Sequence, residues 1–343
     1  MDVDIVSDHK NKTKEISRNE TVIEIGHLKK YYVLRKGFID KILLREQKYV
    51  KAVDDISLDI RRGETFGLVG ESGCGKSTLG RCVLRLESIT AGNIRVFGQN
   101  IRSLADRQLK KLRKEVQVVF QNPYSTLPPH KIIGNMLKEV IHHHEIVKRD
   151  MIKEYCLDLL GQVGLSEVFY TKKPKALSGG QRQRAAIARA LATEPKFIVL
   201  DEPVTALDTS IQAQILNLLM ELQNKRDLTY LFIAHDLSVI RHVSDTVGVM
   251  YLGKLVELAP TKELFQKCLH PYTKSLASSS PLLSEVYRID RIELTGEVPS
   301  SIDPPAGCRF HTRCPFSFSR CSKEEPKLIG PDKGHLVSCF LYS

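Results

Sequence analysis

The sequence lacks any apolar run long enough to cross a membrane. No stretch approaches the roughly 18 consecutive apolar residues that a transmembrane helix needs, although 42% of the 343 residues are hydrophobic. The first twenty residues also lack the apolar core of a signal peptide, because they mix charged residues such as Asp2, Asp4, Lys10 and Lys12. We therefore expect a protein that is made and kept in the cytosol, so that any role at a membrane comes through a partner.

The sequence also lacks a concentrated block of basic residues. Its net charge of +11 can indicate binding to nucleic acid or to an anionic membrane surface. The lysines and arginines are spread along the whole chain, however, which is equally typical of a nucleotide-binding protein with a lysine-rich surface. We expect no nucleic-acid partner.

The cysteines lack the spacings of common metal sites. Four of the eight crowd into the last 36 residues, at Cys308, Cys314, Cys321 and Cys339, and are separated by 5, 6 and 17 residues. Structural zinc sites usually use C-x2–4-C pairs, and bacterial ferredoxins use C-x2-C runs. Because a cytosolic chain rarely forms disulfides, the crowding favours a metal over oxidation. Spacing alone leaves the metal open between iron–sulfur, zinc and none.

Residues 70–78 form the stretch around which the chain is organised. They fit the phosphate-binding pattern G-x-x-x-x-G-K-S. Glycines let successive backbone N–H groups point at anionic oxygens, and a following helix adds the partial positive charge of its N-terminus. The lysine can reach the β- and γ-phosphates, and the serine hydroxyl can bind Mg²⁺. The predicted nucleotide-binding residues of this loop are Gly70, Glu71, Ser72, Gly73, Cys74, Gly75, Lys76, Ser77 and Thr78.

The flanking sequence supports this interpretation. Thr65–Val69 is a short apolar run suited to a buried strand, and residues 78–86 suit a helix. A strand, a glycine-rich loop and a helix are what a polyphosphate site needs. Near that helix N-terminus we expect a lowered pKa for Cys74, so that thiol alkylation would inhibit and ATP would protect.

The remaining segments predict three regions. Residues 1–20 are a polar, disordered lead-in, and residues 261–343 are an extension rich in Pro, Ser and Cys. Between them, residues 21–260 alternate β-like and helical patterns, which is typical of an α/β domain. A basic insertion covers residues 34–51, and residues of about 122–177 read as an inserted, mainly helical subdomain.

Residues 177–184, Leu-Ser-Gly-Gly-Gln-Arg-Gln-Arg, resemble the signature motif of ABC (ATP-binding cassette) ATPases. The companion motifs occur in the family's order: the phosphate loop, Gln121, the signature, Asp201-Glu202, Ala206-Leu207-Asp208 and His235. This resemblance covers residues of about 21–260. It implies a P-loop NTPase cassette of α/β class with an inserted helical subdomain, and an enzyme that hydrolyses ATP with Mg²⁺.

The resemblance also implies the roles of individual residues. It assigns catalysis to Glu202, His235, Gln121 and Lys76, and Mg²⁺ to Ser77, Gln121 and Asp201. Glu202 would be the general base that polarises the attacking water, and His235 would contact the γ-phosphate. Catalysis of this kind depends on positioning and charge neutralisation rather than on covalent chemistry from the protein.

The signature implies a dimer. Ser178, Gly179, Gly180 and Gln181 would form an anion-binding helix terminus that caps the γ-phosphate of ATP held by a second cassette. Asp208 would link the two sites across that dimer. The family also places an aromatic residue against adenine, where stacking gives affinity with little selectivity. Tyr32 fits this position, and Tyr31 is the alternative one residue earlier.

The C-terminal extension is similar to that of oligopeptide and dipeptide importer ATPases, and most similar to their second, F-type, ATP-binding subunit. The resemblance rests on segments such as Cys268–Thr273, Gly296–Pro299 and Pro304–Phe310. It implies a peripheral protein on the cytoplasmic face of the cell membrane, a second ABC ATPase in a heterodimer, two membrane permeases and an external peptide-binding protein. It also implies a [4Fe–4S] cluster on Cys308, Cys314, Cys321 and Cys339. Nickel importers share the pattern.

Two segments depart from the family. Pro128-Pro129-His130 stands where relatives usually have Leu-Asn-Pro-Arg, and Lys173-Pro174 replaces Tyr-Pro. Both lie in the region expected to face the permeases, so that interface is expected to differ in detail. Two alternative functions are a soluble ABC ATPase acting on nucleic acid or the ribosome, and an accessory ATPase of carbon–phosphorus bond cleavage. Soluble ABC ATPases of that kind usually carry two cassettes or a long coiled coil, and this sequence shows one signature motif and neither feature. The cysteine-rich extension argues against the accessory ATPase of carbon–phosphorus bond cleavage.

Overall fold

The computed structural model describes residues 20–34, 47–123, 126–279, 283, 296–332 and 334–343. The predicted lead-in, apart from residue 20, and most of the basic insertion lie outside the described residues. The described chain divides into two compact units. The phosphate-loop unit comprises residues 23–59, 66–96 and 234–343, and the signature unit comprises residues 20–22, 60–65 and 97–233. No helix within these described ranges is long and apolar enough to span a membrane.

The phosphate-loop unit contains a sheet built on β3 (Thr65–Val69), whose five residues are all buried. β3 pairs in parallel with β9 (Thr246–Tyr251). β10 (Lys254–Pro260) returns antiparallel to β9, and β12 (His335–Val337) and β11 (Ile329–Asp332) continue the sheet beyond it. A short continuous apolar run is typical of such a buried strand. The C-terminal extension therefore contributes two strands to the sheet that carries the phosphate loop.

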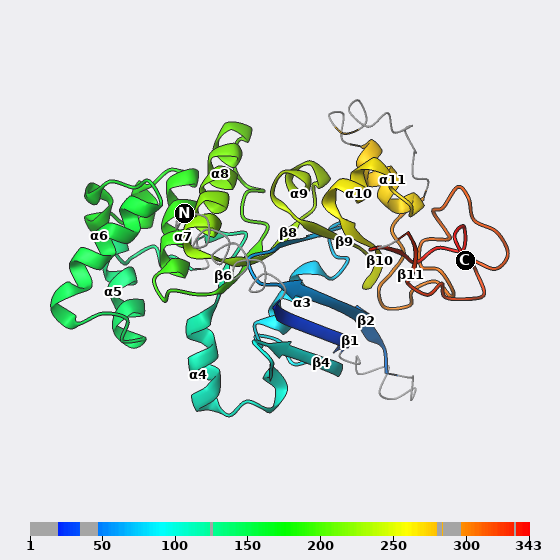
Figure 1. Cartoon of the computed structure of the whole chain (residues 1–343), viewed down its shortest axis with the longest axis horizontal. Coiled ribbons are helices and arrows are strands. Elements are labelled where there is room, and N and C mark those ends of the chain that lie inside the picture. The colour runs from blue at the N-terminus through cyan, green and yellow to red at the C-terminus, as the bar shows by residue number, and fades with distance from the viewer. Residues whose placement is uncertain (1–19, 35–46, 124–125, 280–282, 284–295, 333) are drawn as a thin grey trace, which may run out of the picture. The chain divides into compact units, whose positions relative to one another are not determined.

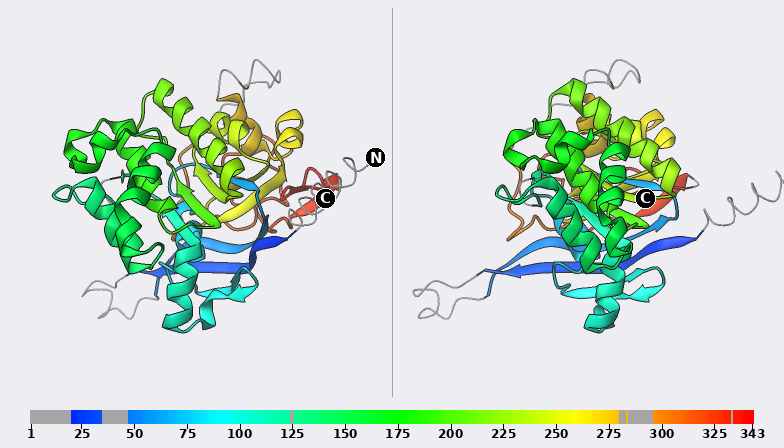
Figure 2. Two further views of the ribbon diagram at one scale, coloured as in Figure 1. Left: turned by 60° about the vertical axis from the view of Figure 1, so that its left-hand side comes forward. Right: turned by 90° about the vertical axis from the view of Figure 1, so that its left-hand side faces the viewer.

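A second layer of this unit consists of long antiparallel strands. β1 (Thr21–Val33) lies between β2 (Tyr49–Arg61) and β4 (Ala91–Val96), with Ile23 opposite Val96. Along β2, buried and exposed residues alternate with the period of two that places one strand face on a core. Figure 2 shows β1 and β2, in two shades of blue, running side by side in both views.

The helices of the phosphate-loop unit are short. Among the residues that the structure describes, they are α3 (Lys76–Val83), α9 (Leu237–Val243), α10 (Thr261–Gln266) and α11 (Pro271–Ser278). α3 begins two residues before the predicted helix and ends three residues before its predicted end. From residue 296 the extension forms mainly turns apart from β11 and β12, drawn in orange and red in Figure 1.

The signature unit contains three parallel strands. β7 (Phe197–Asp201) lies between β6 (Val116–Val119) and β8 (Thr229–Ala234), and every residue of β7 and β8 is buried. Its longer helices include α4 (Asp106–Glu115), α7 (Gly179–Leu191) and α8 (Thr209–Arg226). Parallel strands bring their carboxyl ends to one edge of a sheet. In this unit, that edge is where the acidic pair at 201–202 lies.

The expected helical subdomain is helical in the structure. α5 (Ile133–His143) and α6 (Ile152–Gln162) pack on each other and on α7, and single 3-10 turns join them. The green helices at one end of Figure 1 show this group. Between residues 126 and 178, a range that the structure describes in full, there is no strand.

Candidate functional site

The phosphate loop follows β3 directly, and its last three residues are the first three residues of α3. Lys76 opens that helix and is 3% exposed. Its ammonium group donates to the carbonyl oxygens of Gly70 at 2.7 Å and Glu71 at 3.0 Å, and lies 3.7 Å from the sulfur of Cys74. The loop thus wraps around the lysine and fixes its position at the helix N-terminus. Ser77, the predicted Mg²⁺ ligand, is the next residue on the same helix turn.

The loop needs glycine at its last position before the helix. Gly75 has φ of 109°, a backbone conformation that side chains disfavour. A β-carbon there would collide with the backbone carbonyl oxygen of Ala52 on β2. The glycine pattern that identified the loop therefore has a physical cause in this fold.

Cys74 is not the activated thiol that the sequence led us to expect. The side chain is buried at 4% exposure, and burial raises the pKa of the Cys74 thiol above its usual value even though Lys76 lowers it. The prediction of a lowered pKa was wrong. Its proximity to a helix N-terminus is outweighed by desolvation of the thiolate.

The two tyrosines near the end of β1 have different surroundings. Tyr31 donates its hydroxyl to the carboxylate of Asp54, and burial together with that bond raises its pKa. The ring of Tyr32 is half-buried, and the ammonium group of Lys30 lies 4.5 Å from its centre. Tyr31 is thus engaged within the unit, which supports Tyr32 as the residue that stacks on a base.

In the signature unit, the predicted catalytic carboxylate is held in place. Asp201 ends β7 and is buried, and Glu202 follows with φ of 50°. A positive φ costs about 1 kcal/mol for a residue with a side chain, and such conformations gather at functional sites. The Glu202 carboxylate accepts hydrogen bonds from Gln121 Nε2 at 2.9 Å and Thr205 Oγ1 at 3.2 Å.

The signature segment forms the predicted helix terminus. Ser178 is the N-cap of α7: its hydroxyl accepts from the Gln181 N–H at 3.3 Å, and its own N–H donates to the Gln181 side chain at 2.9 Å. This capping box fixes the first turn of α7. The first two residues of that turn are Gly179 and Gly180. A β-carbon at Gly180 would lie 2.6 Å from Ile211. Asp208, three residues before Ile211, is exposed and is the N-cap of α8.

His235 lies directly after β8 and is exposed. Its neighbour Asp236 caps α9 by accepting from the Ser238 N–H at 2.7 Å. His235 and the phosphate loop belong to the phosphate-loop unit, whereas Gln121, Asp201, Glu202, the signature and Asp208 belong to the signature unit.

All four C-terminal cysteines line one small cavity of about 10 Å³, together with aromatic residues that include Phe310, Phe316, Phe318 and Phe340. None of the four forms a disulfide. Burial raises the pKa of Cys308 to about 11 and also raises the pKa values of Cys314 and Cys339. In the described part of the chain, no three Cys, His, Asp or Glu side chains are arranged to hold a single metal ion.

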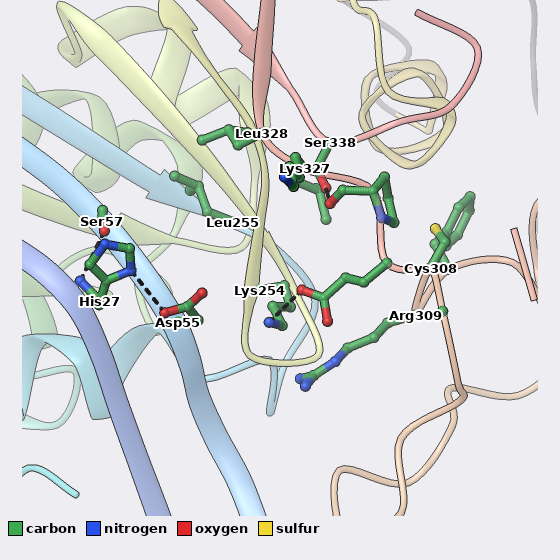
Figure 3. Close-up of a pocket in the computed structure, with 15 residues that line it drawn as sticks. His27, Asp55, Ser57, Lys254, Leu255, Cys308, Arg309, Lys327, Leu328 and Ser338 are labelled. Atoms are coloured by element: carbon green, nitrogen blue, oxygen red, sulfur yellow. Dashed lines mark hydrogen bonds and ion pairs between the residues drawn. The ribbon is translucent and has the colours of Figure 1, made fainter. Parts of the chain in front are cut away.

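A larger cavity, of about 410 Å³, lies elsewhere in the phosphate-loop unit (Figure 3). Its wall includes His27 and Asp55, which pair at 3.1 Å, and Lys254, which pairs with Glu325 at 2.6 Å. Arg309, also in the wall, pairs with Asp54. Of the predicted site residues only Cys308 lines this cavity, so it is not the predicted nucleotide site.

Sequence reasoning missed two residues that contact the phosphate loop. Tyr272 and Arg313 both reach Glu71, although they are 201 and 242 positions later in the chain. They belong to the extension, which the sequence predicts as a separate region. Arg313 is one of two arginines between Cys308 and Cys314, and nothing in the local sequence links it or Tyr272 to the phosphate loop.

Comparisons with known proteins give a consistent result. The family model described as "ABC transporter" matches residues 53–205, and the model "Oligopeptide/dipeptide transporter, C-terminal region" matches residues 256–321. The chain is 47% identical over 330 residues to the oligopeptide transport ATP-binding protein AppF of Bacillus subtilis, covering 95% of this chain and 99% of that protein. It is 45% identical to the dipeptide transport ATP-binding protein DppF of Haemophilus influenzae, covering 96% and 99%.

A solved structure is similar as well. The dimeric ATP-binding cassette MJ0796 bound to ADP and phosphate matches with a TM-score of 0.60 and 28% identity, over 70% of this chain and 98% of that one.

Proposed function

Since the chain belongs to the ABC transporter ATP-binding proteins of oligopeptide and dipeptide transport, we propose that it hydrolyses ATP to power the import of oligopeptides or dipeptides across the cytoplasmic membrane. One observation carries the proposal. A region that matches the ABC transporter family, at 53–205, and a peptide-transporter C-terminal region, at 256–321, lie on a single chain. The ATPase region alone would fit many ABC proteins, and the second region supports peptides as cargo.

The local geometry supports the proposed chemistry. Lys76 is fixed at the start of α3, where its charge and the helix N-terminus would neutralise the phosphates. Ser77 and Asp201 offer the hydroxyl and carboxylate oxygens that Mg²⁺ prefers. Gln121 and Thr205 orient the Glu202 carboxylate, so that it accepts a proton from the attacking water. His235 would contact the γ-phosphate.

The signature would act on a second subunit's nucleotide. The Ser178 capping box presents an ordered helix terminus, which is suited to binding an anion. We propose that it caps the γ-phosphate of ATP in a partner cassette, with Asp208 at the contact between the two sites. The similarity to a cassette dimer bound to ADP and phosphate supports this arrangement.

The proposed complex contains two different ATPases, of which this chain is the second, F-type subunit. The chain is similar over nearly its whole length to AppF and DppF, whose names describe them as oligopeptide and dipeptide transport ATP-binding proteins. Two permeases and an external peptide-binding protein would complete the importer, and the chain would lie on the cytoplasmic face of the membrane as a peripheral subunit.

We also propose that the four C-terminal cysteines bind a [4Fe–4S] cluster. Four thiols that line one cavity are the donor set such a cluster uses, and aromatic residues line the same cavity. The cluster would add a redox couple to the extension.

The first test is a pull-down of the tagged chain from detergent-solubilised native membranes, with mass spectrometry of the bound proteins. Two permeases, a second cassette and a peptide-binding protein would support the importer. Ribosomal proteins, or lyase subunits without a permease, would refute it in favour of a soluble ATPase. A matched Glu202→Gln preparation, reconstituted with the same partners, should bind them equally and fail to accumulate labelled peptide.

The cluster is tested by anaerobic purification. Broad visible absorption with iron and sulfide at about four atoms of each per chain, both lost in a Cys314→Ala variant, is the expected result. Colourless, iron-free protein would refute the assignment, and a Cys156→Ala variant serves as the control because that cysteine lies in the signature unit.

A further inference from the structure

Two residues of the C-terminal extension, Tyr272 and Arg313, contact Glu71 of the phosphate loop. Arg313 Nη1 lies 3.1 Å and 2.9 Å from the two carboxylate oxygens of Glu71. The backbone N–H of Glu71 donates to the hydroxyl oxygen of Tyr272 at 2.8 Å. Arg313 is 8% exposed and Glu71 is 25% exposed at their side chains. One loop residue is thus fixed through both its side chain and its backbone.

This contact reaches the lysine that binds phosphate. The carbonyl oxygen of Glu71 accepts a hydrogen bond from Lys76 Nζ at 3.0 Å. Because Tyr272 and Arg313 hold the same residue, they contribute to the position of that carbonyl oxygen and of the lysine that donates to it.

The pair also changes the charge of the loop. An unpaired carboxylate in a site for a polyphosphate would oppose binding of the anion. Arg313 neutralises Glu71 in a half-buried setting, where such interactions are screened less than at the surface. Arg313 Nε has no hydrogen-bond partner among the described residues, so the guanidinium depends on its contacts to Glu71 and to Tyr251, which lies 3.4 Å away.

The position of Arg313 follows from the cysteine segment. Phe310 packs against Tyr251 and Tyr272, with ring centres 5.2 Å and 5.4 Å apart. The same Phe310 lines the cavity of the four cysteines, and Arg313 directly precedes Cys314. The folding of the 308–314 segment therefore places the arginine that holds the loop.

We propose that Arg313 and Tyr272 are positioning residues through which the C-terminal extension sets the affinity of the phosphate loop for ATP. The proposal rests on the proposed function, in which this loop binds ATP. By linkage, any change in the folding of the 308–314 segment alters ATP affinity, and ATP in turn stabilises that segment by the same factor.

The test measures ATP affinity by calorimetry and ATP hydrolysis in parallel, on the full-length chain with Mg²⁺. In Arg313→Met the Kd for ATP should rise about tenfold, which corresponds to about 1.4 kcal/mol, while kcat at saturating ATP stays within about twofold. Tyr272→Phe removes only the acceptor of the Glu71 N–H, and a rise of about threefold is expected. Arg313→Lys should recover part of the affinity, because it restores the charge.

A second substitution separates positioning from general damage. Glu71→Gln in the Arg313→Met background removes the unpaired carboxylate, so the double variant should bind ATP better than Arg313→Met alone. The control is Lys267→Met, which breaks the exposed ion pair with Asp332 in the same unit and should leave the Kd unchanged.

Hydrogen exchange gives a readout independent of activity. Saturating ATP should slow exchange of peptides covering residues 308–321 in the wild-type chain and in Lys267→Met, and should do so less in Arg313→Met. If Arg313→Met does not fold, Tyr272→Phe and Arg313→Lys decide the matter by the same measurements. Folded Arg313→Met and Tyr272→Phe proteins that bind ATP within twofold of wild type would overturn the inference. A wild-type chain that binds no ATP would refute the proposed function itself.

Discussion

Replacing Glu202 by glutamine isolates the chemical step. The change preserves the shape of the side chain, and the new amide oxygen can occupy the position of Oε2, which now accepts from Gln121 at 2.9 Å and Thr205 at 3.2 Å. Both hydrogen bonds survive, and so does the positive φ of residue 202. What is lost is a carboxylate that can accept a proton, since an amide has no basic oxygen.

The expected loss is large for hydrolysis and small for binding. General base catalysis contributes about 10²–10⁴ in rate, so kcat should fall by at least about a hundredfold, or about 2.7 kcal/mol of barrier. The Kd for ATP should change less than about threefold. Phosphate release from the complex purified from native membranes gives the rate, and calorimetry gives the Kd.

The matched control is Thr205→Ala, which removes one of the two hydrogen bonds and leaves the base. Its kcat should fall by less than about tenfold, in line with the loss of one hydrogen bond of about 1 kcal/mol. Steady-state hydrolysis by Glu202→Gln at the wild-type rate would refute the assignment of the base.

Three further predictions follow from the loop and its surroundings. Gly75→Ala forces a β-carbon against the Ala52 carbonyl at φ of 109°, so it should lower the unfolding temperature and abolish ATP binding, as calorimetry would show. Because burial raises the pKa of Cys74, its thiol should be alkylated far more slowly than a free thiol at pH 7.5, and faster as the pH rises and the thiolate forms. Mass spectrometry of peptides measures the rate, and alkylation of Cys74 as fast as that of a free thiol at pH 7.5 would contradict the prediction. Tyr32→Ala should weaken ATP binding by about 1–3 kcal/mol, the usual range for stacking of a base on an aromatic ring. Tyr31→Phe should leave the Kd for ATP unchanged in the same titration. It should reduce thermal stability, because it removes the hydrogen bond to Asp54.

Local sequence predicted the elements that carry the site. The expected strand at Thr65–Val69 is β3 to the residue, and the expected alternation of strands and helices across residues 21–260 is observed in the described part of that range. The predicted ABC cassette fold is confirmed by the family match and the solved relative. These predictions succeeded because continuous apolar runs and glycine-rich turns impose their conformation on nearby residues.

Properties that depend on burial or on distant contacts could not be predicted. The pKa of Cys74 was expected to fall and instead rises, because burial desolvates the thiolate and the local sequence does not reveal that burial. The hydrogen bond from Gln121 to Glu202 joins residues 81 positions apart. Pairings of that kind depend on strand order, which no local pattern encodes.

The sequence by itself determined the chemistry of this protein. A phosphate loop, a strand ending in two carboxylates and a capped helix at residue 178 each need only a few consecutive residues, whose backbone preferences are local. Only the tertiary structure decided what holds the loop. Arg313 and Tyr272 reach Glu71 from more than 200 residues away, because β11 and β12 join the extension to the sheet that carries the loop.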